Sequence, residues 1–581
     1  MSKFPSTNWP YIIFIGFALF AYSISQSTSD NESKKFLSLT SKLPDNNHKN
    51  SSSEAGNATN FNQIATEKVK SSVHIALIKF ALVEKPFTIT IFILVLCCLK
   101  LTFEYFRKLN ETIPESCMLM LFGIAIGFLF WIPEAQKVLE FLDFKPTVFF
   151  NFLLPPIVLE ASYSFKHRAF NENLRSILLY ALVGTVLNVL IIGPSLYGCY
   201  LLGFMGAYWR TTFLECLMFS TVIAATDPVA ALAIFQSMGV NKMLYFLVFG
   251  ESLFNDGIAI VFYNSIESFI HLDNIGVKEI GIGFAAFLCV CIGAVLIGVL
   301  VGLFSAFVIK YSSTSEGLEP IFIFGFAYLS YLTAQLFDFS AMISLICCAL
   351  CQVHYAFENV SPRSLITVQQ SSYLMSNIAE SITFVMLAAM AIGIKDAWAN
   401  FDPGFSISAV LLCLVVRFLV TFILTFFINR SLSGFRQICR RDQFVLAYGG
   451  LRGPITFSLA FSLQSSTLLD KEKTRHIFLT ASYTVIFFTT FLQGMTMKPL
   501  VKQLQIKLDH SHCQNLFTEV HYQVAQHIGA GIECIANSKG EFYWSAALKN
   551  CSRKVLRPLL NKQCQRKYGN MVEAHSKSSC V

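Results

Sequence analysis

Carboxylate, hydroxyl and amide groups stand together inside an otherwise apolar stretch, VFGESLFNDGIAIVFYN, residues 248–264. On a helix Ser252 and Asp256 are four residues apart and share one face, with Asn255 beside them. Oxygen groups of this kind suit a hard cation, whereas zinc and copper prefer His and Cys, which this stretch does not contain. The carboxylate holds a proton or a sodium ion, but not both well, and that competition is sufficient for exchange. We therefore predict a Na+ site at Asp256.

A second group of polar residues lies at the sequence AATDPVAALAIF, where Thr226 and Asp227 precede Pro228. Proline lacks a backbone donor and its ring clashes with the preceding turn, so a helix breaks there. The carbonyl groups freed by the break are available as further oxygen ligands. The predicted ion-binding residues are Asp256, Asn255, Ser252, Thr226 and Asp227.

Four further charged residues fall within apolar segments, namely Glu251, Glu380, Arg417 and Arg452. A charge at the centre of a spanning helix costs at least about 2.5 to 3.5 kcal/mol on insertion scales, so a retained charge is either paired or used. For Glu251 and Arg417 a structural ion pair is the favoured interpretation. Asp256 is interpreted as functional because of the oxygen-bearing residues around it.

The composition identifies the class of protein in which these charges lie. The chain has 581 residues, of which 54% are hydrophobic and only 14% are charged, and its mean hydropathy is +0.55. Soluble domains carry roughly 25% charged residues, and apolar runs of about 18 residues or more cross a bilayer as helices. We predict an all-α polytopic membrane protein of about 13 transmembrane helices, centred near residues 95, 123, 153, 187, 223, 254, 295, 327, 347, 384, 417, 452 and 488.

The N-terminal region has two parts with different compositions. Residues 1–25 have the layout of a secretory signal peptide, with an uncleaved first membrane helix as the alternative. Residues 26–80 are polar and poor in apolar side chains, so we expect an extracellular, disordered segment that carries N-linked glycans. Its predicted glycosylation sites are Asn31, Asn50 and Asn57.

The remaining chain is predicted to be a transmembrane domain, residues 81–505, followed by a short cytoplasmic tail, residues 506–581. With the N-terminus outside, Lys and Arg are more frequent in the loops that lie inside, which agrees with the positive-inside rule. The net charge of +8 then reflects basic cytoplasmic loops rather than binding to nucleic acid.

Two of the predicted spans contain helix breakers at matching places in the two halves of this domain. Their breakers are Pro228 in the fifth span and Gly449, Gly450, Gly453 and Pro454 in the twelfth. Matched broken helices are the best sequence indication of a substrate site near the midplane of a secondary transporter.

Four motifs, in order along the chain, are FFNFLLPPIVLEASY, ATDPVAALAIF, VFGESLFNDGIAIVFYN and AYGGLRGPITFSLAF. Together they resemble the animal sodium/proton exchangers of the monovalent cation/proton antiporter family, closest to the plasma-membrane branch. The likeness extends from about residue 80 to about residue 540. It implies an inverted-repeat antiporter, a homodimer, that exchanges one extracellular Na+ for one intracellular H+ and needs no cofactor.

The resemblance also implies roles for individual residues. Asp256 matches the ion-binding aspartate of the family, with Asn255 beside it, and Thr226 and Asp227 match the Thr-Asp-Pro motif. Related electrogenic antiporters carry two aspartates where this chain has Asn255 and Asp256, so a single titrating carboxylate in the pair fits one-for-one exchange.

Glu251 and Arg417 resemble the buried pair that joins the sixth and eleventh spans of the family. Glu380 and Arg452 stand where the family keeps charges near its transport core. The stretch VFFNFLLPPI resembles the segment linked to amiloride-type inhibition, although a phenylalanine stripe is also consistent with simple packing. The resemblance implies that Phe150, Phe152 and Leu154 contact the inhibitor.

Two features depart from the family pattern. Pro454 replaces the small residue that usually follows GGLRG, and the chain ends at Val581, ahead of the long regulatory tails of this branch. The tail retains a helical apolar pattern, which resembles the helix that docks a calcineurin B homologous EF-hand partner. A helix on the membrane surface is the alternative. The residues of this pattern are Val520, Val524, Ile528 and Ile532.

We expect a transporter rather than an enzyme, because the sequence contains no phosphate-binding loop, metal-ligand cluster or nucleophile-base motif. The alternatives are an organellar K+(Na+)/H+ exchanger in an endosomal membrane and a transport-inactive membrane scaffold. An ion channel ranks below both, because it does not need the broken repeats. We predict a multi-pass protein of the plasma membrane that binds Na+, H+ and lipid, with Li+ or K+ as further candidate cations.

Overall fold

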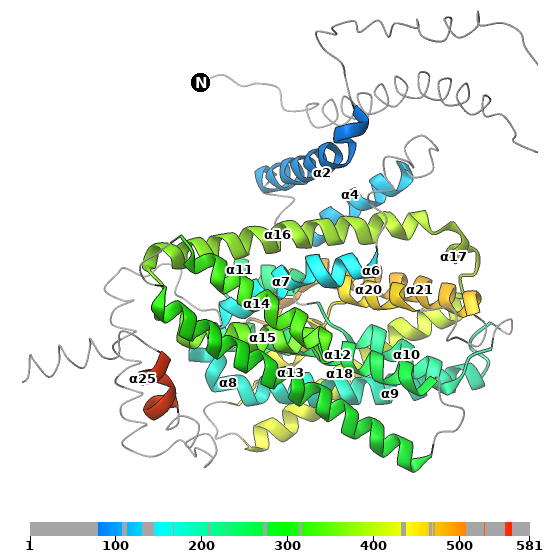
Figure 1. Ribbon diagram of the computed structural model, residues 1–581. Coiled ribbons are helices and arrows are strands. Elements are labelled where there is room, and N and C mark those ends of the chain that lie inside the picture. The colour runs from blue at the N-terminus through cyan, green and yellow to red at the C-terminus, as the bar shows by residue number, and fades with distance from the viewer. Residues whose placement is uncertain are drawn as a thin grey trace, which may run out of the picture. The chain divides into compact units, whose positions relative to one another are not determined.

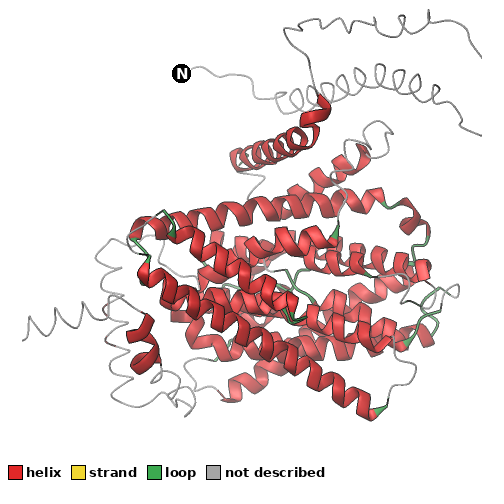
Figure 2. Ribbon diagram, in the orientation of Figure 1, coloured by secondary structure: helices red, strands yellow, loops and turns green. Residues whose placement is uncertain are grey.

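The computed structural model describes residues 80–106, 113–129, 145–166, 168–206, 210–227, 229–270, 276–312, 317–431, 437–463, 468, 471–506, 524, 528 and 552–560. Within these ranges the regular structure is helical, with one isolated β-bridge (Figure 2). The chain divides into two compact units, Met1–Val95 with Leu129–Leu142 and Leu96–Phe128 with Asp143–Val581. The described part of the first unit is helical and belongs to α2 and the end of α4, and the second unit holds the cavities described below.

The helices, with π-helical and 3₁₀ segments written η, are α2 (Phe80–Tyr105), α4 (Glu115–Leu129), α6 (Pro146–Val148), η2 (Phe149–Leu153), α7 (Leu154–Tyr163), η3 (Ser164–Lys166), α8 (Arg168–Leu179), η4 (Tyr180–Gly184), α9 (Thr185–Leu201), α10 (Phe213–Ala224), α11 (Val229–Met238), α12 (Lys242–Ile270), α13 (Val277–Tyr311), α14 (Glu319–Leu336), α15 (Ala341–Cys351), η5 (Gln352–Ala356), α16 (Pro362–Gly393), α17 (Lys395–Ala399), α18 (Pro403–Ser431), α19 (Arg440–Tyr448), α20 (Pro454–Ser462), α21 (Lys471–Phe487), η8 (Phe488–Gln493), α22 (Gly494–Gln503), η10 (Ser552–Leu556) and α25 (Arg557–Leu560) (Figure 1).

Each predicted span centre falls on a helix or on a helix break. Seven of the described helices are long and apolar enough to cross a membrane by length and composition. The others that match predicted spans are shorter, or are divided by a break or a π-helical segment. The all-α membrane fold is therefore confirmed, whereas the count of thirteen crossings stays a prediction.

The two predicted broken helices are interrupted, and their breaks meet. Helix α10 ends at Ala224 and α11 begins at Val229, while α19 ends at Tyr448 and α20 begins at Pro454. Between them the backbone N–H of Asp227 donates to the carbonyl oxygen of Leu451 at 2.7 Å, as an isolated antiparallel bridge. Two segments more than 200 residues apart thus cross at their non-helical centres, as expected for the matched repeats of a secondary transporter.

Helix α12, which carries the carboxylate motif, is central among these helices. In the apolar 18-residue stretch of α12, 89% of the residues are buried, whereas in the corresponding stretch of α13 only 17% are buried. It packs against α8, α10 and η4, whereas α13 lies beside α14 and α15 (Figure 1). Because α13 exposes a long apolar surface, it is suited to face lipid, while the polar groups of α12 are kept inside.

Short π-helical segments divide several helices, among them η2 before Leu154 and η4 before Thr185. A π-helical turn leaves backbone carbonyls without their usual helical partners, and such turns are frequent at functional sites. In η2, side-chain hydroxyl groups donate hydrogen bonds to these carbonyls. The hydroxyl groups of Tyr331 and Tyr328 donate to the carbonyl oxygens of Phe150 and Asn151, at 2.7 and 3.1 Å.

Candidate ion-binding site

A cavity of about 340 Å³ lies where the two helix breaks approach α12. Residues of α2, α4, α7, α11, α15 and α16, with Phe149 of η2 and Ser164 of η3, complete its wall. Five of the carboxylate residues described here line it, namely Glu115, Glu160, Asp227, Asp256 and Glu380. A cavity with this lining offers oxygen ligands in a region that the sequence surrounds with apolar residues, which suits a small hard cation or a proton.

Asp256 has the least exposed carboxylate of this lining, with 5% of the residue accessible. Its Oδ1 atom has no hydrogen-bond partner among the described residues. A buried polar atom without a partner is costly, and the cost is greater for a charged group. The oxygen is therefore available to bind a proton or a cation.

Asn255 holds the broken helix in place beside this carboxylate. Its Nδ2 donates to the carbonyl oxygen of Ala224 at 3.1 Å and to Oγ1 of Thr226 at 3.0 Å. Its Oδ1 accepts from Oγ1 of Thr185 at 2.5 Å. The amide thus joins α12 to the end of α10 and to the start of α9, and both of its donor hydrogens are used.

Thr226 and Ser252 lie against each other, because Oγ1 of Thr226 donates to Oγ of Ser252 at 3.2 Å. Both residues are almost completely buried. Thr226 lines the cavity, whereas Ser252 is not among its lining residues. Of the five predicted ion-binding residues, the cavity is therefore lined by Thr226, Asp227 and Asp256.

Asp227 packs directly on the backbone of Gly453 at the second break. A Cβ atom built on Gly453 would lie 2.1 Å from Oδ2 of Asp227 and 2.5 Å from its Cβ, so a side chain does not fit there. Pro454 occupies the first turn of α20, where the missing backbone donor is not needed and the fixed φ favours the start of a helix. The departure from the family pattern at Pro454 is thus compatible with the local geometry, and Asp227 lies at the favourable N-terminal end of α20.

Arg452 closes the C-terminal end of α10 at the first break. Its Nη1 donates to the carbonyl oxygens of Ala224 and Ala225, at 2.6 and 2.9 Å. Nε and Nη2 approach Sγ of Cys413 at 3.3 Å each, and 1% of the residue is exposed. The guanidinium therefore satisfies the free carbonyls at the C-terminal end of α10, where a positive charge is favourable.

Glu251 and Arg417 form a buried ion pair between α12 and α18. Nη1 of Arg417 donates to Oε1 of Glu251, and Nη2 reaches the carbonyl oxygen of Leu446 at 3.5 Å. The two charged residues are 2% and 5% exposed. Neither lines the cavity, so the pair fits the structural interpretation that the sequence favoured.

Glu380 lines the cavity from α16, where Oγ of Ser376 donates to its Oε1 at 3.4 Å. Three further charged lining residues, Lys100, Glu115 and Glu160, were not singled out from the sequence. Glu160 stands within the quoted motif FFNFLLPPIVLEASY, so a carboxylate inside an apolar motif, four residues after Pro156, is the signal that was available.

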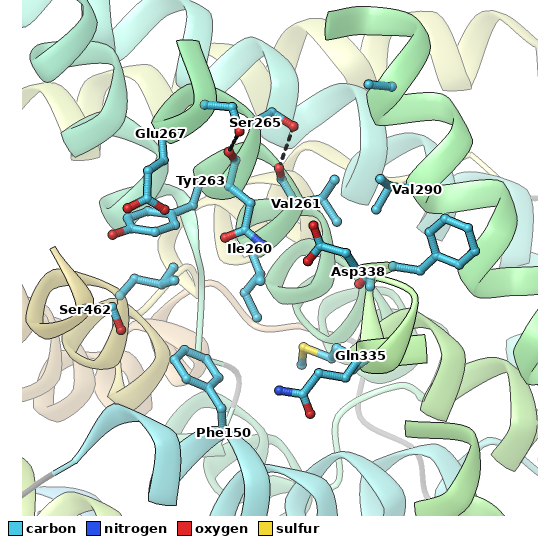
Figure 3. A pocket seen from close by; sticks show the side chains of 18 of the residues that line it. Phe150, Ile260, Val261, Tyr263, Ser265, Glu267, Val290, Gln335, Asp338 and Ser462 are labelled. Carbon is cyan, nitrogen blue, oxygen red and sulfur yellow. Dashed lines mark hydrogen bonds between the residues drawn. The ribbon is translucent and has the colours of Figure 1, made fainter. Parts of the chain in front are cut away.

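A second, larger cavity of about 840 Å³ is lined in part by residues of α7 and α15. Figure 3 shows the carboxylates of Glu267 and Asp338 and the amide of Gln335 around it, with the ring of Phe150 at its wall. Leu154 and Met342 line both cavities, and both side chains are buried. These two apolar residues therefore stand in the layer that separates the cavities.

The predicted inhibitor segment is divided by this arrangement. Phe150 and Leu154 line the larger cavity, and Asn151 does so between them. Phe152 is 67% exposed and is not among the lining residues. Residues two positions apart on a helix point in different directions, so Phe150 lines the cavity while Phe152 does not.

Other predicted features lie outside the described residues. They are Pro228, the segment 1–25, the segment 26–80 apart from Phe80, the sites Asn31, Asn50 and Asn57, and two residues of the partner helix, Val520 and Ile532. The other two, Val524 and Ile528, are helical and are 49% and 57% exposed.

The sequence matches a family model described as sodium/hydrogen exchanger, transmembrane, over residues 91–503. Among curated proteins, it is 41% identical over 500 residues to Na(+)/H(+) exchanger protein 7 of Caenorhabditis elegans, covering 84% of this chain and 63% of the relative. It is 38% identical over 488 residues to sodium/hydrogen exchanger 2 of Oryctolagus cuniculus, covering 84% and 58%. The identity to sodium/hydrogen exchanger 3 of Homo sapiens is 35% over 491 residues, covering 84% and 57%.

The chain thus spans about 60% of the length of the curated relatives it matches. Among solved structures, the fold is similar to that of the sodium proton antiporter MjNhaP1 from Methanocaldococcus jannaschii, with a TM-score of 0.55. The match covers 72% of this chain and 99% of the antiporter, at 17% sequence identity. At this identity the likeness concerns the fold alone.

Proposed function

The chain belongs to the sodium/hydrogen exchanger family, and from this premise we propose that it exchanges extracellular Na+ for intracellular H+ and so regulates cytoplasmic pH, sodium and cell volume. The observation that carries this proposal is the buried Oδ1 of Asp256, which has no partner among the described residues and lies in the cavity at the crossing of two broken helices. Proton and sodium ion compete for that one oxygen site, which couples their movements in opposite directions.

The residues around Asp256 have distinct parts in the proposed site. Asp256 binds the ion, and Asp227 and Thr226, which line the same cavity, supply further oxygen atoms. Asn255 positions the break at Ala224 by its hydrogen bonds rather than by binding the ion through its donors. Because the partner of Asp256 in the motif is a neutral amide, the pair has a single titrating carboxylate, which fits exchange of one Na+ for one H+. Such an exchange moves no net charge, so the cycle is insensitive to voltage.

Two cavities separated by a thin apolar layer support alternating access to this site. Asp256 lines the smaller cavity only. With the N-terminus outside, the ends of the helices around Lys100, Glu115 and Ser164 face the cytoplasm, so the conformation described here is open to the inside. Release to the outside then requires the layer of Leu154 and Met342 to open and the cytoplasmic side to close.

We further propose a multi-pass protein of the plasma membrane that works as a homodimer, with an endosomal membrane as the alternative location. The exposed, helical Val524 and Ile528 support a tail helix that offers its apolar side to a calcineurin B homologous EF-hand protein or to lipid. A pull-down with the EF-hand protein, using Val524→Asp as the comparison, distinguishes the two.

The test is the recovery of cytoplasmic pH after an acid load, in cells that lack their own exchangers. Na+, Li+ and K+ are supplied in turn with the voltage clamped, and Asp256→Asn is measured beside the parent. We expect Na+-dependent, voltage-insensitive recovery that Asp256→Asn abolishes. Recovery with K+ alone indicates the organellar type of exchanger, and a parent at the surface that moves no protons with any cation refutes transport in favour of a scaffold.

A further inference from the structure

Cys413 of α18 lies against the buried guanidinium of Arg452, although it does not line the Asp256 cavity. Nε and Nη2 of Arg452 each donate to its Sγ atom at 3.3 Å. The exposed fractions of Arg452 and Cys413 are 1% and 3%. A guanidinium carries its donors in a rigid plane, and Nε with one terminal nitrogen forms a fork that a single acceptor occupies. The sulfur of Cys413 therefore fixes one edge of the guanidinium.

Another part of the same plane is bound to the first helix break. Nη1 of Arg452 donates to the carbonyl oxygens of Ala224 and Ala225, at 2.6 and 2.9 Å. Because the guanidinium is planar and rigid, its direction at these carbonyls depends on its contact with the sulfur. Cys413 and the end of α10 thus hold Arg452 from different sides.

The backbone of Arg452 is held separately, by η8. Its N–H donates to Oγ1 of Thr489 at 3.2 Å, and its carbonyl oxygen accepts from Oγ1 of Thr490 at 3.4 Å. With the main chain fixed in this way, the freedom that remains to Arg452 is that of its side-chain rotamers, which are numerous for a long side chain. The contact with Cys413 limits this freedom.

The face of α18 that carries Cys413 also covers the second break. Cys413 and Arg417 are four residues apart on this helix and share one face of it. Nη2 of Arg417 reaches the carbonyl oxygen of Leu446, in the last turn of α19, at 3.5 Å. A Cβ atom built on Gly450 would lie 2.8 Å from Nε of Arg417. Through Arg452, Cys413 extends the contact of this face to the first break.

The backbone that Arg452 holds leads directly into the proposed site. Ala225 is followed by Thr226 and Asp227, which line the cavity. A hard cation binds several oxygen atoms at once, so its affinity depends on how they are placed. A proton needs one carboxylate oxygen, which Asp256 supplies from α12. A loosened break should therefore weaken the binding of Na+ more than that of H+.

We propose that Cys413 is a positioning residue for Na+ binding, whose sulfur keeps Arg452 on the carbonyl oxygens of Ala224 and Ala225. It thereby fixes the two residues that follow, Thr226 and Asp227. This inference rests on the proposed function, because that function assigns these two residues to the ion. Since Cys413 does not line the cavity, it acts on the apparent affinity for Na+ through Arg452.

The experiment measures proton efflux in cells that lack their own exchangers, first against external Na+ and then against cytoplasmic pH. Cys413→Ala removes the acceptor of the guanidinium. We expect its KM for Na+ to rise roughly two- to ten-fold, the change in an equilibrium constant that one hydrogen bond of typical net strength gives. The cytoplasmic pH of half-maximal efflux should stay at the parent value. Cys413→Ser keeps an acceptor at this position and should keep the parent KM.

A second readout uses the purified protein and does not depend on transport. The midpoint of thermal unfolding is measured against NaCl, with choline chloride holding the ionic strength constant. Because an ion that binds the folded state stabilises it, the NaCl concentration that gives half of the Na+-dependent rise reports the affinity. This concentration should increase in Cys413→Ala by about the same factor as KM.

Cys348→Ala is the matched control, because it removes a buried sulfur whose partner is the carbonyl oxygen of Phe326, at 4.0 Å. Both changes delete the same buried atom, so both lower the stability by a similar mechanism, and a purely structural role of Cys413 would leave its KM at the parent value. If Cys413→Ala does not reach the surface, Cys413→Val and Cys413→Thr replace the first pair. These two side chains have the same shape, and the threonine alone keeps an acceptor.

Equal KM values for Na+ in Cys413→Ala and Cys413→Ser, or in the valine and threonine variants, overturn the inference. So does an equal rise in Cys348→Ala, or a shift in the proton dependence as large as that in KM. A parent that moves no protons with Na+ and is not stabilised by NaCl refutes the proposed function instead, so the two failures are distinguishable.

Discussion

The backbone N–H of Asp227 donates to the carbonyl oxygen of Leu451 at 2.7 Å, so that the centres of two broken helices are joined to each other. Around this crossing two of the half-helix ends meet a charged side chain. Arg452 closes the carbonyl end of α10, and the N-terminal end of α20 is met by the carboxylate of Asp227. Irregular backbone at membrane depth is tolerated only where such partners or a cavity are present. The crossing is therefore a structural centre, and Oδ1 of Asp256, which has no hydrogen-bond partner among the described residues, lies in the cavity beside it.

Replacing Asp256 by Asn is expected to abolish exchange while the protein still folds. The amide has nearly the same shape, and its burial without a charge is less costly than that of the carboxylate. Loss of Na+-dependent pH recovery, with surface labelling and thermal stability within experimental error of the parent, is the expected result. Substantial exchange in Asp256→Asn would place the coupling carboxylate elsewhere, with Asp227 as the next residue to test.

Replacing Gly453 by Ala should disturb the crossing through a clash with Asp227. The added Cβ would lie 2.1 Å from Oδ2 of Asp227, and overpacking of a tight site costs typically about 1 to 3 kcal/mol. We expect a lower midpoint of thermal unfolding in detergent and slower exchange. Gly281→Ala on α13 is the matched control, because a Cβ there meets nothing within 4 Å. Equal effects of the two changes would contradict the close packing at the crossing.

Breaking the pair between Glu251 and Arg417 should destabilise the fold rather than alter ion selectivity. Arg417→Met leaves the buried Glu251 carboxylate uncompensated, which costs about 3 to 5 kcal/mol, whereas removal of both charges is often nearly neutral. Thermal unfolding of Arg417→Met, Glu251→Met and the double variant forms a double-mutant cycle. We expect the double variant to recover most of the lost stability. A double variant as unstable as the sum of the single ones would argue against coupling of the two residues.

Thr185 is expected to support exchange through Asn255, without contacting the ion. Thr185→Val keeps the side-chain shape but removes the hydroxyl that lies 2.5 Å both from Oδ1 of Asn255 and from the carbonyl oxygen of Ala181. A buried acceptor left without its partner costs about 1 to 3 kcal/mol. We expect a weaker apparent affinity for Na+ because the amide no longer fixes the break. Thr333→Val is the control, since that exposed hydroxyl bonds only to its own helix, at Leu329, and a similar loss there would remove the argument for positioning.

The helices and the breaks follow from the sequence, because their signals are local. The length of an apolar run is enough to predict a membrane-spanning helix. Pro454 and its neighbouring glycines predict the second break without any knowledge of the fold. The pair of Glu251 and Arg417 was also anticipated, because two opposite charges in apolar segments need partners. The inhibitor contact predicted for Phe152 rests on the family resemblance, and the side chain is 67% exposed and outside the lining of both cavities.

The hydrogen-bond partners and the rim of the cavity do not follow from sequence in the same way. Thr185 and Asn255 are 70 positions apart, and a threonine in an apolar run has no feature that marks its partner. Lys100 and Glu115 flank apolar segments, where charges ordinarily mark the ends of spanning helices. Only the contacts of Lys100 with Glu115 and Asn377 bring these two residues together in the lining of the Asp256 cavity.

The orientation of the two cavities predicts which thiols an impermeant reagent reaches from each side. Ser268 is exposed and lines the larger cavity, whereas Ala233 is exposed and lines the smaller one. The thiol of Ser268→Cys should be labelled from outside, and the thiol of Ala233→Cys should be labelled from the cytoplasm. The parent protein, which has its own cysteines, gives the background labelling. Because the layer of Leu154 and Met342 separates the cavities, we expect no labelling of Ala233→Cys in intact cells until the membrane is permeabilised. The reverse pattern would invert the topology.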